Sequence, residues 1–378
     1  MKRALIVAAT GGFLKGFLIP DMKLLQEMGY EVHCAANGTS VSTFVPEELF
    51  ASIGVTFHQV EFSSTSPISK ESVLAYKQYR QLMNQYHFDF VHVHTPIPGA
   101  IVRAATMWER RKGCTVVYTT HGLTFPKGSS LKTKMIFGGI EWICSWLSDG
   151  IITINREDFA QMKKMACKNV YYINGVGVDT ARYHACQIDR SAYRKTLGLT
   201  ENDIAVLEVG ELSVRKNHKV IIDALAKLND DKYIFLICGK AMTNSGTYDF
   251  LKKYAEEKHV RVNFLGFRAD IPEINHCVDI AVLPSLREGL GLAGIEALAS
   301  GVPVVGSEIQ GIKDYVVDGV TGFLCPPTDA ETFAEKIKVL SDETVRNAMK
   351  DACIAKAEEF RMDISRQQMR DIYTQLLR

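Results

Sequence analysis

No stretch of this 378-residue sequence approaches the roughly 18 consecutive apolar residues that a membrane-spanning helix needs. The short apolar run at 4–9 is interrupted by Thr10, Gly11 and Gly12, so it predicts a buried first strand rather than a signal peptide. Any membrane contact is therefore expected to be peripheral.

The sequence also lacks an excess of charge of either sign. Lys and Arg total 44 and Asp and Glu total 43, which gives a net charge of +1. A nucleic-acid-binding protein needs a basic surface to neutralise phosphates, so we expect no nucleic-acid partner. With 47% hydrophobic residues, the chain is long enough to build two domains with separate cores.

Paired cysteines are missing as well. The nine cysteines include no C-x-x-C pair and their number is odd, which argues against both a disulfide framework and a zinc site. No D-x-D pair follows a predicted strand, so no metal bridge to a diphosphate is supplied. We expect a reduced, cytoplasmic protein that needs no metal and no other cofactor.

Short apolar runs alternate with amphipathic helical stretches, which predicts parallel strands joined by crossover helices in an α/β fold with two doubly wound sheets. Strands are expected at 4–9, 32–36, 55–62, 90–94, 116–120, 151–154, 170–173, 204–209, 234–238, 262–265, 280–284 and 302–305, and helices include 19–28 and 70–86.

A glycine-containing segment at 174–179, flanked by Asn and Asp, predicts a sharp reversal between the domains. We therefore expect an N-terminal domain over 1–175 and a C-terminal domain over 176–359. The last helix, at about 360–378, has no strand after it. Two positions are open for it, either outside the second sheet or back on the first domain.

Open α/β sheets bind ligands beyond the carboxyl ends of their strands, so the loops found there are candidate sites. The segment 284–301 combines a strand end, a glycine-rich turn and a helix that starts near Gly291, and it carries Glu288 and Glu296. Backbone N–H groups at such a helix start favour a phosphate, and the two carboxylates can accept hydrogen bonds from hydroxyls. An ordinary helix with a solvated glutamate is the alternative, and the surrounding glycines favour the site.

Three further strand ends carry weaker signals. Arg215 and Lys216 follow Gly210 and could clamp a diphosphate or could be ordinary solvated cations. His121 follows the fifth strand, where a structural histidine is the alternative. The pair Gly11–Gly12 ends the first strand without G-x-G-x-x-G spacing, which disfavours a dehydrogenase.

In this order and spacing, the sequence resembles glycosyltransferase family 4, whose members are retaining enzymes of the GT-B fold with two Rossmann-like domains facing a cleft. Glu288-x7-Glu296 is similar to the E-x7-E motif of the family. The segments 120–128, 154–158 and 174–179 resemble the branch that builds capsular, exopolysaccharide and O-antigen repeat units.

The resemblance implies a role for each candidate residue. Glu288 would contact hydroxyls of the donor sugar and Glu296 the ribose. Lys216 would bind the diphosphate, and His121 would lie near the reacting sugar. The other residues expected to contact the donor nucleotide and diphosphate are Gly11, Gly12, Gly210, Gly289, Leu290, Gly291, Leu292 and Ala293, with the backbone of Phe267 and Arg268 at the base.

Two positions depart from the family pattern. Glu211 stands where many members carry an arginine, and Arg215 is the candidate replacement for that cation. Gly291 stands where proline is usual. Cations and the helix terminus would stabilise the leaving diphosphate.

The implied reaction is transfer of a hexose or N-acetylhexosamine from a nucleotide diphosphate sugar, commonly a UDP-sugar, to a glycan acceptor. The usual proposal for such enzymes is a front-face displacement in which the protein supplies position and electrostatics. Two alternatives remain open. An epimerase or phosphorylase of the same architecture lacks a supporting motif here, and a non-catalytic nucleotide-sugar-binding partner of a transferase would be compatible with Glu211.

The expected acceptor is a sugar linked to polyprenyl diphosphate at the inner membrane face. The family branch is one reason, and the other is that basic residues lie beside aromatic ones, which suits an anionic bilayer. Solvated charges on an ordinary helix face are the alternative. The basic residues are Arg103, Arg110, Arg111, Lys112, Lys127, Lys132 and Lys134, and the aromatic ones are Trp108, Phe125 and Phe137.

Overall fold

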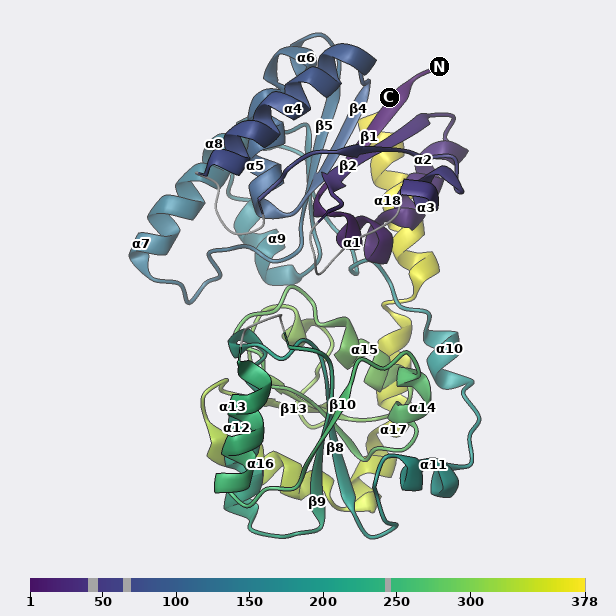
Figure 1. The fold of residues 1–378 in the computed structure, drawn as a ribbon, viewed down its shortest axis with the longest axis vertical. Coiled ribbons are helices and arrows are strands. Elements are labelled where there is room, and N and C mark those ends of the chain that lie inside the picture. Colours follow the sequence, from purple (N-terminus) through teal and green to yellow (C-terminus); the bar gives the residue numbers. More distant parts are fainter. Residues whose placement is uncertain (40–46, 64–68, 242–245, 378) are drawn as a thin grey trace. The chain divides into compact units, whose positions relative to one another are not determined.

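Each half of the chain forms its own parallel β-sheet (Figure 1). The computed structural model describes residues 1–39, 47–63, 69–241 and 246–377. The chain divides into unit 1, which comprises Met1–Val176 and Ser365–Arg378, and unit 2, which comprises Gly177–Ile364.

The sheet of unit 1 has seven strands in the order β3-β2-β1-β4-β5-β6-β7, and all neighbours pair in parallel. The strands are β1 (Arg3–Thr10), β2 (Glu31–Asn37), β3 (Thr56–Gln59), β4 (Phe90–His94), β5 (Thr115–Thr120), β6 (Gly150–Thr153) and β7 (Val170–Tyr172). The helical segments are α1 (Gly11–Phe13), η1 (Leu14–Leu18), α2 (Ile19–Glu27), α3 (Glu47–Ala51), α4 (Lys70–Tyr86), α5 (Pro96–Ala105), α6 (Met107–Arg111), α7 (Leu131–Thr133), η2 (Lys134–Gly138), α8 (Gly139–Trp146), α9 (Arg156–Met162) and α18 (Met362–Leu376).

Unit 2 has a six-stranded parallel sheet in the order β10-β9-β8-β11-β12-β13. Its strands are β8 (Ile204–Val209), β9 (Tyr233–Cys238), β10 (Val262–Gly266), β11 (Ile280–Leu283), β12 (Val304–Ser307) and β13 (Gly322–Cys325). The helical segments are α10 (Thr180–His184), α11 (Arg190–Thr196), η3 (Val214–Lys216), α12 (His218–Leu228), α13 (Thr247–Glu257), α14 (Ile271–Asn275), α15 (Leu292–Ala299), η4 (Ile312–Asp314), α16 (Ala330–Leu340) and α17 (Glu343–Glu358).

Burial on both faces explains why the strands are apolar runs. All residues of β4, β6, β9 and β11 are buried, as expected for parallel strands covered by crossover helices. Complete burial of the strands accounts for the apolar runs in the sequence. The structure has two doubly wound sheets, as predicted.

The strand β13 is the one that the sequence analysis missed among the described residues. It follows a turn-rich segment and is short, and it begins at Gly322, whose φ is +144°. A Cβ at Gly322 would lie 1.9 Å from the carbonyl oxygen of Val304, so this strand can pair closely with β12 only because its first residue is glycine.

The chain after β1 passes directly into a helix. Gly11 and Gly12 open α1, and the Thr10 hydroxyl caps it by accepting a hydrogen bond from the Phe13 amide at 3.3 Å. The helical path then continues through η1 into α2.

The C-terminal helix α18 packs against unit 1. His92 Nδ1 and the Tyr373 hydroxyl lie 2.7 Å apart, and both residues are buried. The Ser365 hydroxyl donates a hydrogen bond to the Asn174 carbonyl at 3.3 Å. The chain therefore leaves unit 1 after Val176 and returns to it at Ser365.

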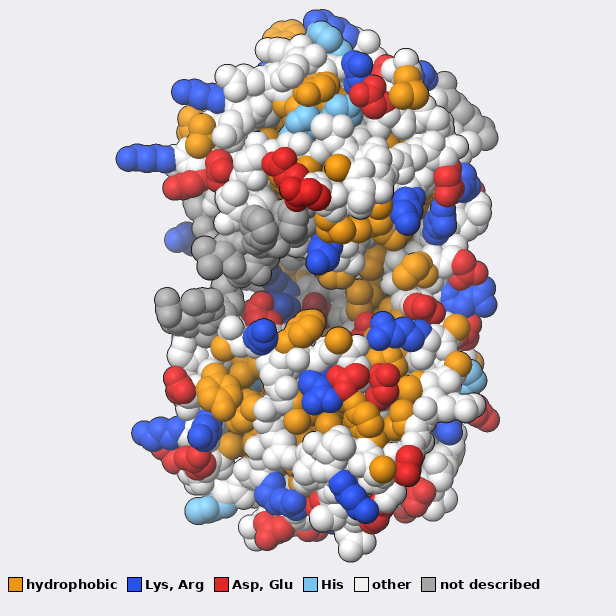
Figure 2. Space-filling view, turned by 45° about the vertical axis from the view of Figure 1, so that its right-hand side comes forward, with side chains coloured by type: hydrophobic (Ala, Val, Ile, Leu, Met, Phe, Trp, Pro, Cys, Tyr) orange, Lys and Arg blue, Asp and Glu red, His pale blue; other side chains and the backbone are white. Residues whose placement is uncertain are grey.

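Charges of both signs are interspersed over the face drawn in Figure 2, where Lys and Arg (blue) alternate with Asp and Glu (red). This distribution agrees with the net charge of +1 and offers no broad basic surface on that face.

Candidate active site

The loops after β8 and β11 meet where the strand order of unit 2 reverses. These two strands are neighbours in the sheet, and the crevice at such a switch point is where open α/β sheets bind ligands. Lys216, at the end of η3, places its Nζ 2.8 Å from Oε2 of Glu288, in the loop after β11. The fold thus brings together two predicted site residues that are 72 positions apart.

Asn217 fixes the loop that carries Lys216. It adopts a left-handed conformation with φ of +61°, which asparagine tolerates better than most residues. Its side-chain amide donates hydrogen bonds to the carbonyls of Pro284 at 3.0 Å and Pro327 at 2.8 Å. The Arg215 carbonyl accepts a hydrogen bond from the Leu286 amide at 2.8 Å. The cations are therefore held by the same loop that carries Glu288.

Glu288 is a nearly buried carboxylate held by two cations. Its side chain is 13% exposed, and Arg215 Nη1 also approaches Oε2 at 3.3 Å. Burial acts to raise the pKa of Glu288, but the charges of Lys216 and Arg215 outweigh it and hold the pKa below its ordinary value. Glu288 is consequently ionised at neutral pH, as an acceptor for sugar hydroxyls must be to bind them strongly.

A glycine-rich turn leads from Glu288 into α15. Gly291 has φ of +81° and immediately precedes the helix. Proline fixes φ near −65°, so the residue usual in the family cannot adopt this conformation. A Cβ at Gly294 would lie 2.4 Å from the hydroxyl of Tyr315, which donates a hydrogen bond to the Gly291 carbonyl at 3.0 Å. Leu292 and Ala293 open the helix, and the first amides of a helix have no acceptor within it.

Glu296 lies in α15, half-buried. Burial raises its pKa, and the hydrogen bond with Tyr183 and the charge of Arg182 offset only part of that effect. The carboxylate is thus oriented by Tyr183, from α10.

The predicted diphosphate loop is tightly packed. A Cβ at Gly239 would lie 1.7 Å from the Gly210 carbonyl oxygen, and a Cβ at Gly210 would lie 3.0 Å from Cε of Lys216. Glycine at 210 therefore lets the lysine side chain lie across the loop. Glu211 is exposed.

The predicted base-binding segment follows β10. The Phe267 side chain is 70% exposed, and Lys240 Nζ lies 5.7 Å from its ring centroid. The Arg268 guanidinium is engaged by Asp270, with Nε 2.8 Å from Oδ1. A ligand at this position would consequently meet the backbone of Arg268 rather than a free guanidinium.

Beneath Lys216 lies a buried pair to which the sequence analysis gave no role. Glu208 Oε1 and His218 Nε2 are 3.5 Å apart. Within the described residues, neither the Glu208 oxygens nor the His218 nitrogens have a hydrogen-bond partner. Burial raises the pKa of Glu208 well above its ordinary value and lowers that of His218 to about 4. The available signal was a glutamate within the apolar run of β8.

His121 in unit 1 has a defined orientation. Its Nε2 lies 3.0 Å from Nδ1 of His94, the last residue of β4, and the Phe13 ring meets it edge-on at 4.8 Å between centroids. Burial lowers the pKa of His121 to about 4, so its ring is neutral at neutral pH. Segments at the ends of three neighbouring strands therefore build this predicted site.

Behind His94 lie His92 and Asp21. Their ligand atoms and that of His94 lie within 4.8 Å of one another, the one such group within the described ranges. Both nitrogens of His92 are already hydrogen-bonded, to Tyr373 and Thr119 at 2.7 Å each. A metal ion here would have to break one of these bonds, and metal independence of the reaction stays a prediction.

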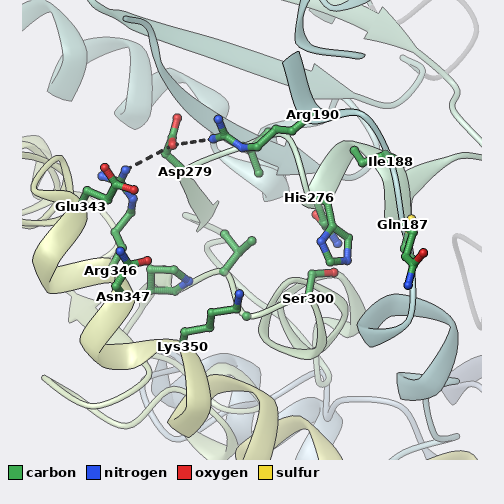
Figure 3. Close-up of a pocket in the computed structure, with 16 residues that line it drawn as sticks. Gln187, Ile188, Arg190, His276, Asp279, Ser300, Glu343, Arg346, Asn347 and Lys350 are labelled. Atoms are coloured by element: carbon green, nitrogen blue, oxygen red, sulfur yellow. Dashed lines mark hydrogen bonds and ion pairs between the residues drawn. The ribbon is translucent and has the colours of Figure 1, made fainter. Parts of the chain in front are cut away.

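A cavity of about 440 Å³ in unit 2 lies elsewhere (Figure 3). Its lining residues Asp279 and Pro303 directly precede β11 and β12, so it sits at the amino ends of the strands. Asp279 accepts hydrogen bonds from Arg190 at 3.0 Å and Arg346 at 3.4 Å, so these cations are already paired. The cavity therefore does not belong to the switch-point site.

Family models match both halves of the chain. Residues 22–182 match the model described as Glycosyltransferase Family 4, and residues 189–359 match Glycosyl transferases group 1. EpsD of Bacillus subtilis strain 168, a protein named as a glycosyltransferase, is 32% identical over 90% of this chain and 87% of its own. The chain belongs to glycosyltransferase family 4.

Other similarities agree with this assignment. The UDP-Gal:α-D-GlcNAc-diphosphoundecaprenol α-1,3-galactosyltransferase of Escherichia coli is 28% identical over 72% of this chain and 71% of its own. The structure of Anabaena HepE in complex with UDP and glucose superposes with a TM-score of 0.79 at 20% identity, covering 99% of this chain and all of that one. The fold is GT-B, as predicted. The protein is a glycosyltransferase, and a further relative of Escherichia coli, 26% identical over 59% of this chain and 62% of its own, is named as an O-antigen biosynthesis glycosyltransferase.

Proposed function

We propose that the enzyme transfers a hexose or N-acetylhexosamine from a UDP-sugar to a lipid-linked glycan acceptor, with retention of anomeric configuration and without a metal ion. The observation that carries the proposal is the Lys216–Glu288 pair at the switch point, beside the start of α15. It combines a cation for phosphate, a carboxylate for hydroxyls and a helix N-terminus in one site.

The diphosphate is assigned to Lys216, Arg215 and the first amides of α15. Negative charge grows on the diphosphate oxygen as its bond to the sugar breaks, and fixed positive groups at that position stabilise the transition state. The donor sugar hydroxyls are assigned to Glu288 and the ribose to Glu296. The half-buried position of Glu296 and its contact with Tyr183 support this second role.

The proposed transfer is a front-face displacement. The bond between the anomeric carbon and the diphosphate oxygen breaks, the acceptor oxygen bonds to the same face of that carbon, and the acceptor proton passes to the departing oxygen. His121, neutral and held by His94, is assigned to the reacting sugar rather than to a charged role. The UDP-dependent galactosyltransferase among the relatives supports both a UDP-sugar donor and a diphosphate-lipid acceptor.

Purified enzyme mixed with a panel of nucleotide sugars tests the donor through the rise in melting temperature, which grows with ln(1 + [L]/Kd). UDP-sugars are expected to stabilise it more than those of other bases. NMR of the product formed from an α-linked donor then reads the configuration. A β-linked product would reject the retaining mechanism, and conversion of donor without acceptor would favour an epimerase.

A further inference from the structure

A continuous helix of unit 1, formed by α7, η2 and α8 over 131–146, exposes an unusual amount of apolar surface. Only a narrow side of it packs on the domain, through Glu141, Cys144 and Ser145. In Figure 1 the α7 end projects away from the sheet of unit 1. The large apolar side chains that it exposes are Leu131, Met135, Ile136, Phe137, Ile140, Trp142, Ile143 and Trp146.

The structure corrects part of the membrane surface that the sequence predicted. Arg103 is completely buried, and its guanidinium binds Glu141 through two hydrogen bonds of 2.6 and 2.9 Å. Phe125 is buried as well. Arg103 anchors the helix through Glu141, and Phe125 lies beneath the helix at Gly138. Neither side chain is exposed for contact with a bilayer. The apolar contact has to come from the helix itself.

The exposed charge on this helix is positive. Lys132 and Lys134 are exposed, whereas its acidic residue, Glu141, is neutralised by Arg103. On the adjoining α6, Glu109 is paired with Arg80. An apolar face flanked by lysines is complementary to an anionic lipid surface.

Two of the three tryptophans of the chain, Trp142 and Trp146, lie on this helix, and the third, Trp108, lies on α6. Trp108, Trp142 and Trp146 are 50–60% exposed, although tryptophan is normally largely buried in a soluble protein. A hydrogen bond of 3.2 Å from Arg110 to the Trp146 carbonyl ties α6 to the end of α8. Tryptophan concentrates at the boundary between water and lipid because its ring is apolar and its N–H is polar.

We propose that this helix lies in the headgroup region of an anionic bilayer and holds the enzyme at the membrane surface. A helix of this length, about 24 Å at 1.5 Å per residue, is too short to cross the bilayer core, and no helix among the described residues is long and apolar enough to do so. A second copy of the chain is a poorer occupant, because its face would carry the same excess of positive charge and the two faces would repel each other.

Tryptophan fluorescence tests the proposal with the full chain and without donor or acceptor. Vesicles of phosphatidylglycerol and phosphatidylcholine are expected to shift the emission to shorter wavelength, and lipids brominated on their acyl chains are expected to quench it. Pure phosphatidylcholine should bind at least tenfold more weakly, since each cation near an anionic surface contributes about fivefold in affinity. Self-association would instead give a shift that depends on protein concentration, without bromine quenching, and would overturn the proposal.

Variants locate the contact. Ile136→Glu combined with Ile143→Glu is expected to lower affinity for anionic vesicles at least tenfold. Val339→Glu, at an apolar position of α16 that is 43% exposed against 48% for Ile136, is the matched control and should bind like the wild type. Lys132→Glu combined with Lys134→Glu should remove the preference for anionic lipid. An unchanged melting temperature shows that each variant is folded, and a folded isoleucine double variant that binds normally would overturn the proposal.

The lipid surface adds to the proposed function, and the two can fail separately. If the vesicles do not bind but a detergent-solubilised lipid-linked acceptor is glycosylated, the surface is wrong and the reaction stands. If the vesicles bind but only short soluble acceptors are glycosylated, the surface stands and the proposed acceptor is wrong.

Discussion

Replacing Lys216 by alanine tests the electrostatic core of the proposed mechanism. Its Nζ is 2.8 Å from Glu288, and the two side chains are only 12% and 13% exposed. The substitution removes a cation that needs little reorganisation when charge develops on the diphosphate. Deleting one such preorganised group costs about 10²- to 10³-fold in kcat, or roughly 2.7–4 kcal/mol.

Arg215 is the internal comparison for this prediction. It also approaches Glu288, but at 3.3 Å and with 39% of its side chain exposed, so water screens its charge more strongly. Arg215→Ala is therefore expected to lower kcat about tenfold, which is a smaller loss than the one expected for Lys216→Ala. Equal losses would mean that the two cations stabilise the leaving group to the same extent, contrary to the larger share expected of the less exposed Lys216.

The pH profile separates a catalytic effect from a structural one. With Lys216 present, the pKa of Glu288 is depressed; without it, the burial that raises this pKa is opposed mainly by Arg215. The acid limb of kcat should consequently move to higher pH in Lys216→Ala, because Glu288 is protonated earlier. Single-turnover transfer of labelled sugar measures both effects, and UDP binding confirms a folded site. A folded variant with near wild-type turnover would refute the role of Lys216.

Four further outcomes are expected. Glu288→Gln should lower transfer at least tenfold while UDP, measured by calorimetry, still binds, because the amide keeps the size but loses the charge-assisted bonds to the sugar. Transfer should survive EDTA, and restoration of lost activity by Mg²⁺ or Mn²⁺ would contradict the metal-free mechanism. His94→Gln should lower kcat by freeing the ring of His121 while leaving UDP affinity unchanged, which single-turnover and binding measurements resolve. UDP affinity should weaken as pH falls through the raised pKa of Glu296, since the protonated acid is a poorer acceptor for the ribose, and Glu296→Gln should give a flat profile.

Much of the fold could be predicted because a parallel strand that is buried on both faces needs apolar residues at successive positions, and such runs are visible in the sequence. The run at 280–284 yielded β11, and helix 70–86 coincides with α4, which Ser69 caps through the Ser72 amide. The strand β13 was not predicted, because its pairing with β12 depends on Gly322, which fits against the backbone of Val304. Such a contact leaves no periodic pattern.

The candidate site was predictable to the extent that it depends on strand ends. Lys216 and Glu288 could be associated because each follows a strand, and β8 and β11 are the central pair of a doubly wound sheet. Their 2.8 Å contact could not be predicted, because it depends on the side-chain bonds of Asn217 to two other loops. The family role of each residue remains a proposal that the variants above test.

Residues whose importance depends on their surroundings could not be found from the sequence. Glu208 and His218 are separated by a strand end, a loop and η3, and only the fold buries them as neighbours under Lys216. An uncharged Glu208 leaves the Lys216 ammonium free to pair with the Glu288 carboxylate. An ionised Glu208 would attract the same ammonium at short range and compete with Glu288 for it. Burial, followed by the charge of Glu288, raises the pKa of Glu208 against the opposing charge of Lys216, and this shift favours the uncharged acid that leaves Lys216 available to the carboxylate and phosphate groups of the site.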